Sequence, residues 1–291
     1  MAFISLGLTS GIIAICLEEV MIVRKGRVQF GLLLLLLTLI AGCSKSACPP
    51  GGDMVLIPAG EFIMGNDAGD DDEKPEHTVY LDEFCIDKYE VTNAQYKECV
   101  DAGVCNPPAR PSSPSRFSYY GNPEFDNYPV IWITWNDAQT YCKWRGKRLP
   151  TEAEWEKAAR GTDGRLWPWG NSDPDGSKAN LCDVNCTHDW KESHLDDGYT
   201  DTAPVGSFEA GKSPYGVYDM VGNVREWVAD WYAPDYYRNG PDRNPPGPSS
   251  GIGKALRGGS WRSNLPVARI TYRLWYSPDV KDEYIGFRCA K

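Results

Sequence analysis

The sequence predicts a single α+β domain with little regular secondary structure, which we place at residues 53–291. Three short stretches carry the end signals of helices, and the segments that read as strands are brief. From residue 161 onward Gly, Pro, Asn and Asp recur every few residues, and apolar runs stay short. Such a stretch cannot form long helices or a large regular sheet, so aromatic packing, ion sites or disulfides must hold it together.

The first half of the domain contains the regular elements. The segment MVLIPAGEFIMG at 54–65 predicts two short strands, because Pro58-Ala59-Gly60 is a turn signal between apolar runs. The acidic stretch 67–76 has no periodicity and predicts a solvated loop. Capping boxes begin at Thr92 and Thr151, and Thr134 has an acidic residue in the turn that follows it. With glycine stops downstream, these signals predict helices at about 92–102, 135–145 and 151–160.

The composition excludes several classes of protein. The 30 basic and 40 acidic residues give a net charge of −10, which argues against a nucleic-acid binder, because such proteins need a basic surface. A mean hydropathy of −0.45 excludes a protein with many membrane spans. The 11 Trp and the 12% aromatic content are ample for a packed core. Ten cysteines are unusual for a cytosolic enzyme and point to an oxidising compartment.

The N-terminal segment predicts export and lipid attachment. A basic stretch after Met21 leads into an apolar run that is too short to span a membrane and ends in small residues. The four residues ending at Cys43, IAGC, resemble the bacterial lipobox, in which the cysteine is lipidated. We therefore interpret residues 1–42 as a leader with translation starting at Met21, and 43–52 as a tether. The mature protein is expected outside the cytoplasm on a bacterial membrane, with an outer-membrane location favoured by Ser44.

Seven strings carry a family resemblance. They are MVLIPAGEFIMG, DKYEVTNAQY, GKRLPTEAEWEKAARG, TAPVGSF, YGVYDMVGNVREWVADW, LRGGSW and IGFRCA. In this order they resemble the formylglycine-generating enzyme (sulfatase-modifying factor) family over nearly the whole mature chain. The resemblance implies a C-type-lectin-like α+β fold of low regularity, in agreement with the pattern above. It does not by itself imply the activity.

The resemblance implies an oxidoreductase, but the residues for that reaction are missing. Family enzymes that oxidise a sulfatase cysteine bind Cu(I) with two cysteines after the GGS motif, because Cu(I) prefers thiolates. The matching positions here are Ser263 and Ala268, and no cysteine lies between Cys186 and Cys289. We therefore expect no copper-dependent formylglycine generation. A family branch with a histidine-bound nonheme iron is equally disfavoured, since the chain has three histidines and lacks that branch's helical domain.

Calcium is the cofactor that the resemblance does support, in a structural role. Two sets of matching positions offer the mixed carboxylate and carbonyl oxygens that a hard cation requires. The first set is Asp219, Gly222, Val224 and Glu226, and the second is Asn180, Leu181, Asp197 and Tyr199.

Eight cysteines remain for disulfides once Cys16 and Cys43 are assigned to the leader and the lipid anchor. The resemblance implies a bridge between Cys142 and Cys289. Short loops could also be closed by Cys99 with Cys105 and by Cys182 with Cys186, and this leaves Cys48 and Cys85 by elimination. An alternative for LCDVNCTHDWKESH is a zinc site of Cys182, Cys186, His188 and His194.

The substrate groove of the family runs beside the GGS segment, so the resemblance implies a cleft there. The candidates to line it are Ser260, Trp261, Arg262, Ser263 and Arg269, of which Arg262 and Arg269 could hold a carboxylate or phosphate. The alternative is that Trp261 packs in the core and the arginines pair with surface carboxylates. Arg225 replaces a common aromatic of the family motif and either alters the groove or faces solvent. Ser260 has no base partner in a hydrolase motif. Two functions stay open: a calcium-stabilised binding or accessory module for a peptide, glycan or protein, and a protein-modifying oxidoreductase with a noncysteine site.

Overall fold

The computed structural model describes Cys48 and residues 52–291. The leader 1–42, the start at Met21, the lipidation site Cys43 and most of the tether 43–52 therefore lie outside the described residues. Within Cys48 and 52–291, no helix has both the length and the apolar character needed to cross a membrane.

The N-terminal part of the domain contains two antiparallel strand pairs. Strands β1 (Met54–Ile57) and β4 (Phe84–Asp87) pair antiparallel, and so do β2 (Gly60–Met64) and β3 (His77–Leu81). The two strands expected in the segment 54–65 are confirmed, and each pairs with a later strand.

A four-stranded sheet forms the second framework. Its order is β7 (Leu274–Tyr276), β6 (Lys254–Arg257), β5 (Arg225–Trp231) and β8 (Ile285–Gly286). Strands β5 and β6 are antiparallel, whereas β5 and β8 are parallel. The strands are short, as the interrupted sequence after residue 161 predicts.

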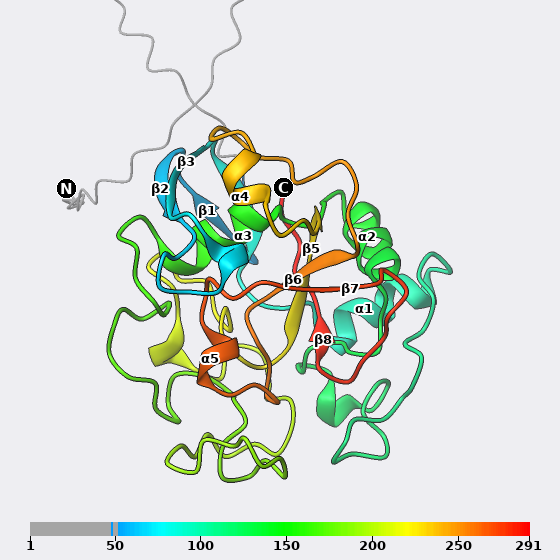
Figure 1. The fold of residues 1–291 in the computed structure, drawn as a ribbon. Helices are drawn as coiled ribbons and strands as arrows, with labels where there is room; N and C mark the ends of the chain where they lie inside the picture. Colours follow the sequence, from blue (N-terminus) through cyan, green and yellow to red (C-terminus); the bar gives the residue numbers. More distant parts are fainter. Residues whose placement is uncertain (1–47, 49–51) are drawn as a thin grey trace, which may run out of the picture. The chain divides into compact units, whose positions relative to one another are not determined.

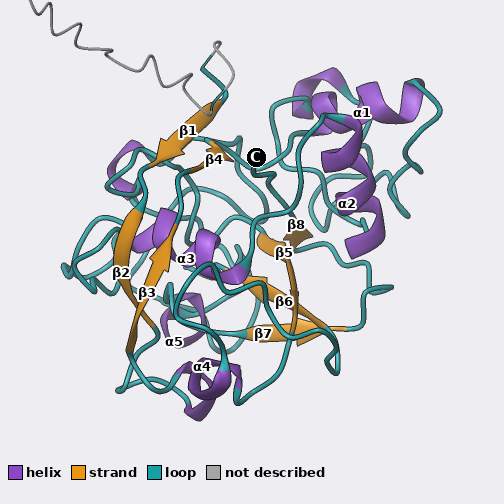
Figure 2. Cartoon of the chain, turned by 90° about the horizontal axis from the view of Figure 1, so that it is seen from above, coloured by secondary structure: helices purple, strands orange, loops and turns teal. Residues whose placement is uncertain are grey.

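Three helices match the predicted ones. They are α1 (Asn93–Asp101), α2 (Trp135–Trp144) and α3 (Glu152–Arg160), each capped by the threonine that precedes it. Helices α1 and α2 lie together on one side of the four-stranded sheet, and β2 and β3 lie on the other (Figures 1 and 2). Two single-turn helices, α4 (Tyr236–Asn239) and α5 (Leu265–Ala268), and 3-10 turns at Asp71–Glu73, Pro123–Phe125 and Glu209–Gly211 complete the helical elements of the described ranges.

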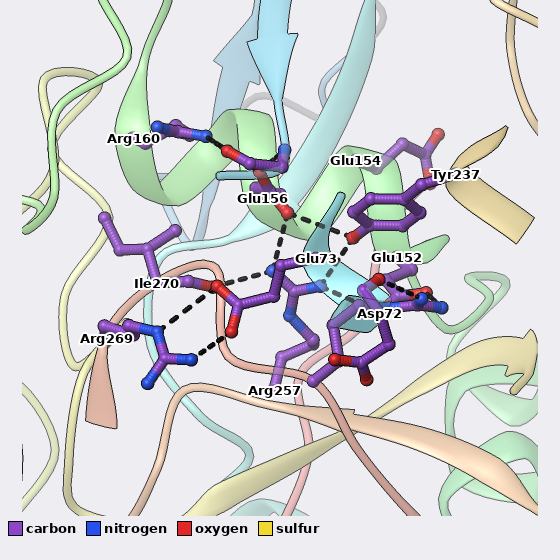
Figure 3. A network of polar contacts seen from close by, with 12 residues as sticks. Asp72, Glu73, Glu152, Glu154, Glu156, Arg160, Tyr237, Arg257, Arg269 and Ile270 are labelled. Atoms are coloured by element: carbon purple, nitrogen blue, oxygen red, sulfur yellow. Dashed lines mark hydrogen bonds and ion pairs between the residues drawn. The ribbon is translucent and has the colours of Figure 1, made fainter. Parts of the chain in front are cut away.

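Helix α3 is buried along its whole length although five of its nine residues are charged. A network of ion pairs makes this possible (Figure 3). Arg257 on β6 is fully buried and lies 2.7 Å from Glu152 and 2.6 Å from Glu156. Arg160 pairs with Glu156, and Arg273 pairs with Glu152. Buried charges need partners of this kind, so the network fixes α3 against β6.

The acidic stretch 67–76 differs from its prediction at one residue. Glu73 is fully buried and forms an ion pair with Arg269, while Asp71 is exposed and Asp72 is half-buried. The prediction of a wholly solvated loop is therefore wrong at Glu73. Sequence periodicity could not reveal the error, because the partner lies 196 residues further along the chain.

The described cysteines form four disulfides. The pairs are Cys48–Cys85, Cys99–Cys105, Cys142–Cys289 and Cys182–Cys186. Because Cys182 and Cys186 are bonded to each other, neither is a thiolate ligand, and the zinc alternative is wrong. His188 stacks on Trp190 instead, with ring centroids 4.3 Å apart.

Candidate functional site

A cleft of about 480 Å³ lies beside the GGS segment. Its walls come from the loop after β6, from β7 and from the residue before β8, with a tryptophan from the 182–195 region. The lining residues are Trp190, Arg225, Ser260, Arg262, Ser263, Asn264, Val267, Leu274, Tyr276 and Tyr284.

The turn that carries Ser260 and Ser263 is shaped by close backbone packing. Gly259 has a φ of +69°, and a Cβ there would lie 2.8 Å from the Cα of Ala268. Glycine is the residue that this approach permits. The Ser263 hydroxyl accepts a 3.0 Å hydrogen bond from the Ser260 amide, which fixes the hydroxyl inside the turn. The backbone amide of Trp261 donates to the Asn223 carbonyl at 2.9 Å, so the turn rests on the segment that begins β5.

Three of the five predicted cleft residues line the cleft, namely Ser260, Arg262 and Ser263. Trp261 does not, because its side chain is buried and its Nε1 donates to the Glu283 carbonyl. Arg269 does not either, because its guanidinium pairs with Glu73 (Figure 3) and also with Asp70. The expectations for Trp261 and Arg269 are therefore corrected.

Arg225 is a lining residue that the sequence left undecided. It is the first residue of β5, and its neighbour Glu226 is the second. Side chains alternate between the faces of a strand. Glu226 points inward, where Arg288 and Trp155 donate to its carboxylate, and Arg225 takes the opposite face at the cleft. Its side chain is 6% exposed, so it does not face solvent.

The first predicted calcium set lies in a tight turn before β5. Asp219 and Asn223 both have left-handed backbones, with φ of 55° and 51°. The Asp219 carboxylate accepts a 2.6 Å hydrogen bond from the Gly206 amide. Burial raises the pKa of Asp219 to about 6. Val224 contributes a backbone amide that donates to Glu90 at 3.1 Å.

Glu90 packs against this turn and accepts hydrogen bonds from Asn223 and Val224, and no sequence pattern predicted it. Its side chain is 1% exposed, and burial raises its pKa well above the usual range, with a further contribution from Asp219 and Glu226. Three carboxylates thus lie near one arginine, Arg288, which carries the ion pair to Glu226. Glu90 belongs to the string DKYEVTNAQY, more than 120 residues upstream, so position in that shared string was the available signal.

The second predicted set adjoins the first. The Asn223 amide donates to the Asn180 carbonyl at 2.9 Å, and a Cβ on Gly222 would lie 2.2 Å from that oxygen. Asp197 accepts hydrogen bonds from the amides of Leu181 and Tyr199, at 2.8 and 2.9 Å.

Two features of this second set bear on a cation. The buried side-chain oxygen of Asn180 has no hydrogen-bond partner. Burial raises the pKa of Asp197 to about 7. In the described part of the chain, no cluster of three or more His, Cys, Asp or Glu side chains is arranged to bind a metal ion. A cation here would therefore depend on carbonyl and amide oxygens as well.

The two positions at which the resemblance implies copper-binding cysteines carry no thiolate. Ser263 lines the cleft with a hydroxyl, and Ala268 is fully buried. Hydroxyl oxygen is a poor ligand for Cu(I). Every cysteine among Cys48 and 52–291 is in a disulfide.

The structure is that of a low-regularity α+β protein of the C-type-lectin-like kind with a cleft beside the GGS segment, which confirms the predicted fold class. The family model described as sulfatase-modifying factor enzyme 1-like domain matches residues 41–291, and the chain belongs to that family.

Individual relatives agree with this assignment. A Streptomyces coelicolor protein named formylglycine-generating enzyme is 35% identical, over 81% of this chain and 88% of its own length. A Bos taurus protein named inactive C-alpha-formylglycine-generating enzyme 2 is 32% identical, over 82% and 87%. The solved structure of PvdO from Pseudomonas aeruginosa has a TM-score of 0.66 at 30% identity, over 81% of this chain and 93% of that one.

Proposed function

We propose that the protein is an exported, lipid-anchored and calcium-stabilised binding or accessory module that does not carry out copper-dependent cysteine oxidation. The observation that carries the proposal is the cleft itself. It has the position of a substrate groove, yet Ser263 and Ala268 replace the thiolate pair, and the described cysteines are all consumed by disulfides.

The name of one relative supports the proposal that a member of this family can lack cysteine-oxidising activity. A Bos taurus protein at 32% identity carries the name inactive, so the family fold persists in a chain that is named as a non-enzyme. By contrast, the relative from Streptomyces coelicolor at 35% identity is named as the generating enzyme. Identity alone therefore does not decide between the two functions, and the residues of the cleft do.

Oxygen consumption tests the loss of catalysis. Purified protein is loaded with Cu(I), given a sulfatase-motif peptide, and followed by oxygen uptake and peptide mass. The Streptomyces coelicolor relative serves as the positive control. We expect no uptake above the peptide-only rate. Peptide-dependent turnover would overturn the proposal and favour a protein-modifying oxidoreductase with a noncysteine site.

Two observations support calcium at the two predicted sets. The free oxygen of Asn180 and the surplus carboxylates Glu90 and Asp219 are groups that a buried divalent cation stabilises. When bound, calcium would supply positive charge and bridge the segments around residues 180 and 222. The residues of the chain would contribute side-chain and carbonyl oxygens from Asn180, Leu181, Asp197, Tyr199, Asp219, Gly222 and Val224. The remaining predicted ligand, Glu226, is held by Arg288 and Trp155, and would have to share its carboxylate with them.

Thermal unfolding with and without EGTA tests calcium binding. A ligand at about 100 times its Kd adds about 2.7 kcal/mol, which corresponds to a Tm shift of about 5–10 °C for a domain of this size. We expect EGTA to lower the Tm and Asn180→Ala to reduce the shift. The control is Asp175→Asn, an exposed carboxylate outside both sets, which should behave as wild type. An EGTA-independent Tm would contradict the calcium proposal.

Membrane attachment is tested separately through Cys43. We expect the wild-type protein, expressed in a bacterial host, to partition with membranes and to incorporate a fatty-acid label. Cys43→Ser is expected to lose the label. Equal labelling of the two proteins would rule out lipidation at this cysteine.

A further inference from the structure

Arg225 differs from every other deeply buried arginine in the described part of the chain. Arg160, Arg257, Arg273 and Arg288 each pair with at least one glutamate at 3.0 Å or less. Among the described residues, Arg225 forms no ion pair with a carboxylate, and the groups that act on its charge are tyrosines. Its Nη2 donates to the Ser263 hydroxyl at 3.2 Å, and its buried Nη1 has no hydrogen-bond partner.

The groups that face Arg225 do not neutralise it. The ionisable side chains that interact with its charge are the phenols of Tyr272, Tyr276 and Tyr284. The guanidinium carbon lies 5.6 Å from the centroid of the Tyr272 ring. Burial raises the pKa of Tyr284 further, so this phenol stays neutral. Burial lowers the pKa of Arg225, yet a guanidinium remains charged at physiological pH. An uncompensated charge of this kind is strongly destabilising, which is why a ligand that supplies the counter-charge would be favoured.

The cleft around this charge has a mixed lining. Val267, Leu274, the Trp190 ring and the tyrosine rings offer apolar surface, while the Ser260 hydroxyl offers a further polar contact. The second cation, Arg262, stands at the side of the cleft and is partly neutralised by Glu283 at 3.9 Å. One guanidinium without a carboxylate partner therefore faces a cleft with both polar and apolar walls, which matches a singly charged oxyanion on an apolar body better than a dianionic phosphate.

We infer that the cleft binds the carboxylate of an apolar or aromatic acid, with Arg225 as its counter-charge. The inference rests on the proposed binding function and names its ligand class. Because Nη1 is covered in this structure, the carboxylate reaches it when a lining side chain moves aside. A charge-assisted hydrogen bond in a partly dry cleft gives the ligand both orientation and affinity.

The test uses 3-phenylpropionate as the probe and 3-phenylpropanamide as its neutral isostere, titrated by calorimetry into the full-length protein. We expect the acid to bind at least tenfold more tightly than the amide. Arg225→Met is expected to lose that preference and to keep or raise the Tm, because it removes an unpaired buried charge. Arg243→Gln, which changes an exposed arginine on a distant loop, is the matched control and should bind as wild type.

Several results would overturn the inference. Equal binding of acid and amide to the unmodified protein would do so without any variant. Undiminished acid binding by Arg225→Met would place the site elsewhere, and a large fall in its Tm would identify Arg225 as a structural residue. Tighter binding of phenyl phosphate than of the acid would replace the carboxylate by a dianion. The oxygen-uptake test is independent of these outcomes, so failure here would leave the proposed loss of catalysis standing.

Discussion

Replacing Arg257 by methionine tests whether the buried ion-pair network holds helix α3 in place. Arg257 donates to Glu152 at 2.7 Å, to Glu156 at 2.6 Å, to the Tyr237 hydroxyl at 3.0 Å and to the Ile270 carbonyl at 2.6 Å (Figure 3). Methionine fills much of the space but donates nothing. The substitution leaves buried acceptors without this donor.

The expected loss follows from which partners survive. Glu152 keeps Arg273, and Glu156 keeps Arg160 and the Gly65 amide. Removing one member of a buried ion pair costs about 3–5 kcal/mol when the other charge is left uncompensated. Because both glutamates retain an arginine, we expect a loss near the lower end, about 3 kcal/mol.

Equilibrium urea unfolding with the disulfides intact measures the effect. With a slope of about 2–3 kcal/mol/M, the midpoint should fall by about 1–1.5 M. Lys97→Met, which breaks an exposed pair with Asp101, is the control and should change stability by less than about 0.5 kcal/mol. If Arg257→Met lay within that same range, the reasoning that the network stabilises the fold would be refuted.

Three other measurements probe the charges and the crosslinks. Burial raises the pKa of Asp230 from 3.8 to about 8, and the nearby Glu152 carboxylate raises it further. Because the folded protein holds this proton more tightly than the unfolded chain, the free energy of unfolding falls as pH increases from about 4 to 8. Asp230→Asn should therefore flatten the decline in unfolding free energy between pH 5 and 7.5, by up to about 1.4 kcal/mol per pH unit; an unchanged slope contradicts this. Burial alone would raise the pKa of Glu152, but its ion pairs with Arg273 and Arg257 outweigh burial and lower the pKa to about 2. The wild-type protein should therefore lose stability as pH falls from about 4.5 toward 2, and Arg257→Met should lose less. Replacing Cys142 and Cys289 together by serine opens a loop of 147 residues and should cost about 4–5 kcal/mol in urea unfolding; a loss under 1 kcal/mol would show that the bridge does not constrain the unfolded chain.

The helices could be predicted from sequence because their signals are local. Thr92, Thr134 and Thr151 each accept a hydrogen bond from the backbone three residues later, and those pairs are visible in the sequence as spacing. The turn glycines after the helices are local in the same way. Such signals require no knowledge of the tertiary fold.

The charge network of α3 could not be predicted, because its partners are far apart along the chain. Glu152 and Arg257 are separated by 105 residues, and Glu73 and Arg269 by 196. A charged residue in a helix predicts a solvated face unless a distant partner is known. The same reason explains why Arg269 was expected in the cleft: its sequence position is correct, but Glu73 draws the side chain away.

Some features of the cleft could likewise be predicted from the sequence, and others could not. The GGS string located the loop, and Ser260, Arg262 and Ser263 follow from it. Arg225 lines the cleft because side chains alternate along β5: Glu226 points inward, so Arg225 lies on the opposite face. This placement requires knowing where β5 begins. The unpaired state of its guanidinium is a property of the whole surroundings, and no local pattern reports it.

The turn before β5, which we propose binds calcium, is linked to the cleft through the backbone of Asn223, and this leads to a last prediction. The Asn223 amide donates to the Asn180 carbonyl, and the Asn223 carbonyl accepts from the Trp261 amide, each at 2.9 Å. A bound calcium that orders the turn would therefore also order the serine turn of the cleft. We expect EGTA to weaken 3-phenylpropionate binding several-fold at a temperature where the protein stays folded, and calcium to bind more tightly in the presence of the acid by the same factor, since coupling between two sites is reciprocal. Asp175→Asn should show the wild-type coupling. Acid affinity that is identical with and without calcium, in protein whose Tm does respond to EGTA, would show that the shared Asn223 contact transmits nothing between the two sites.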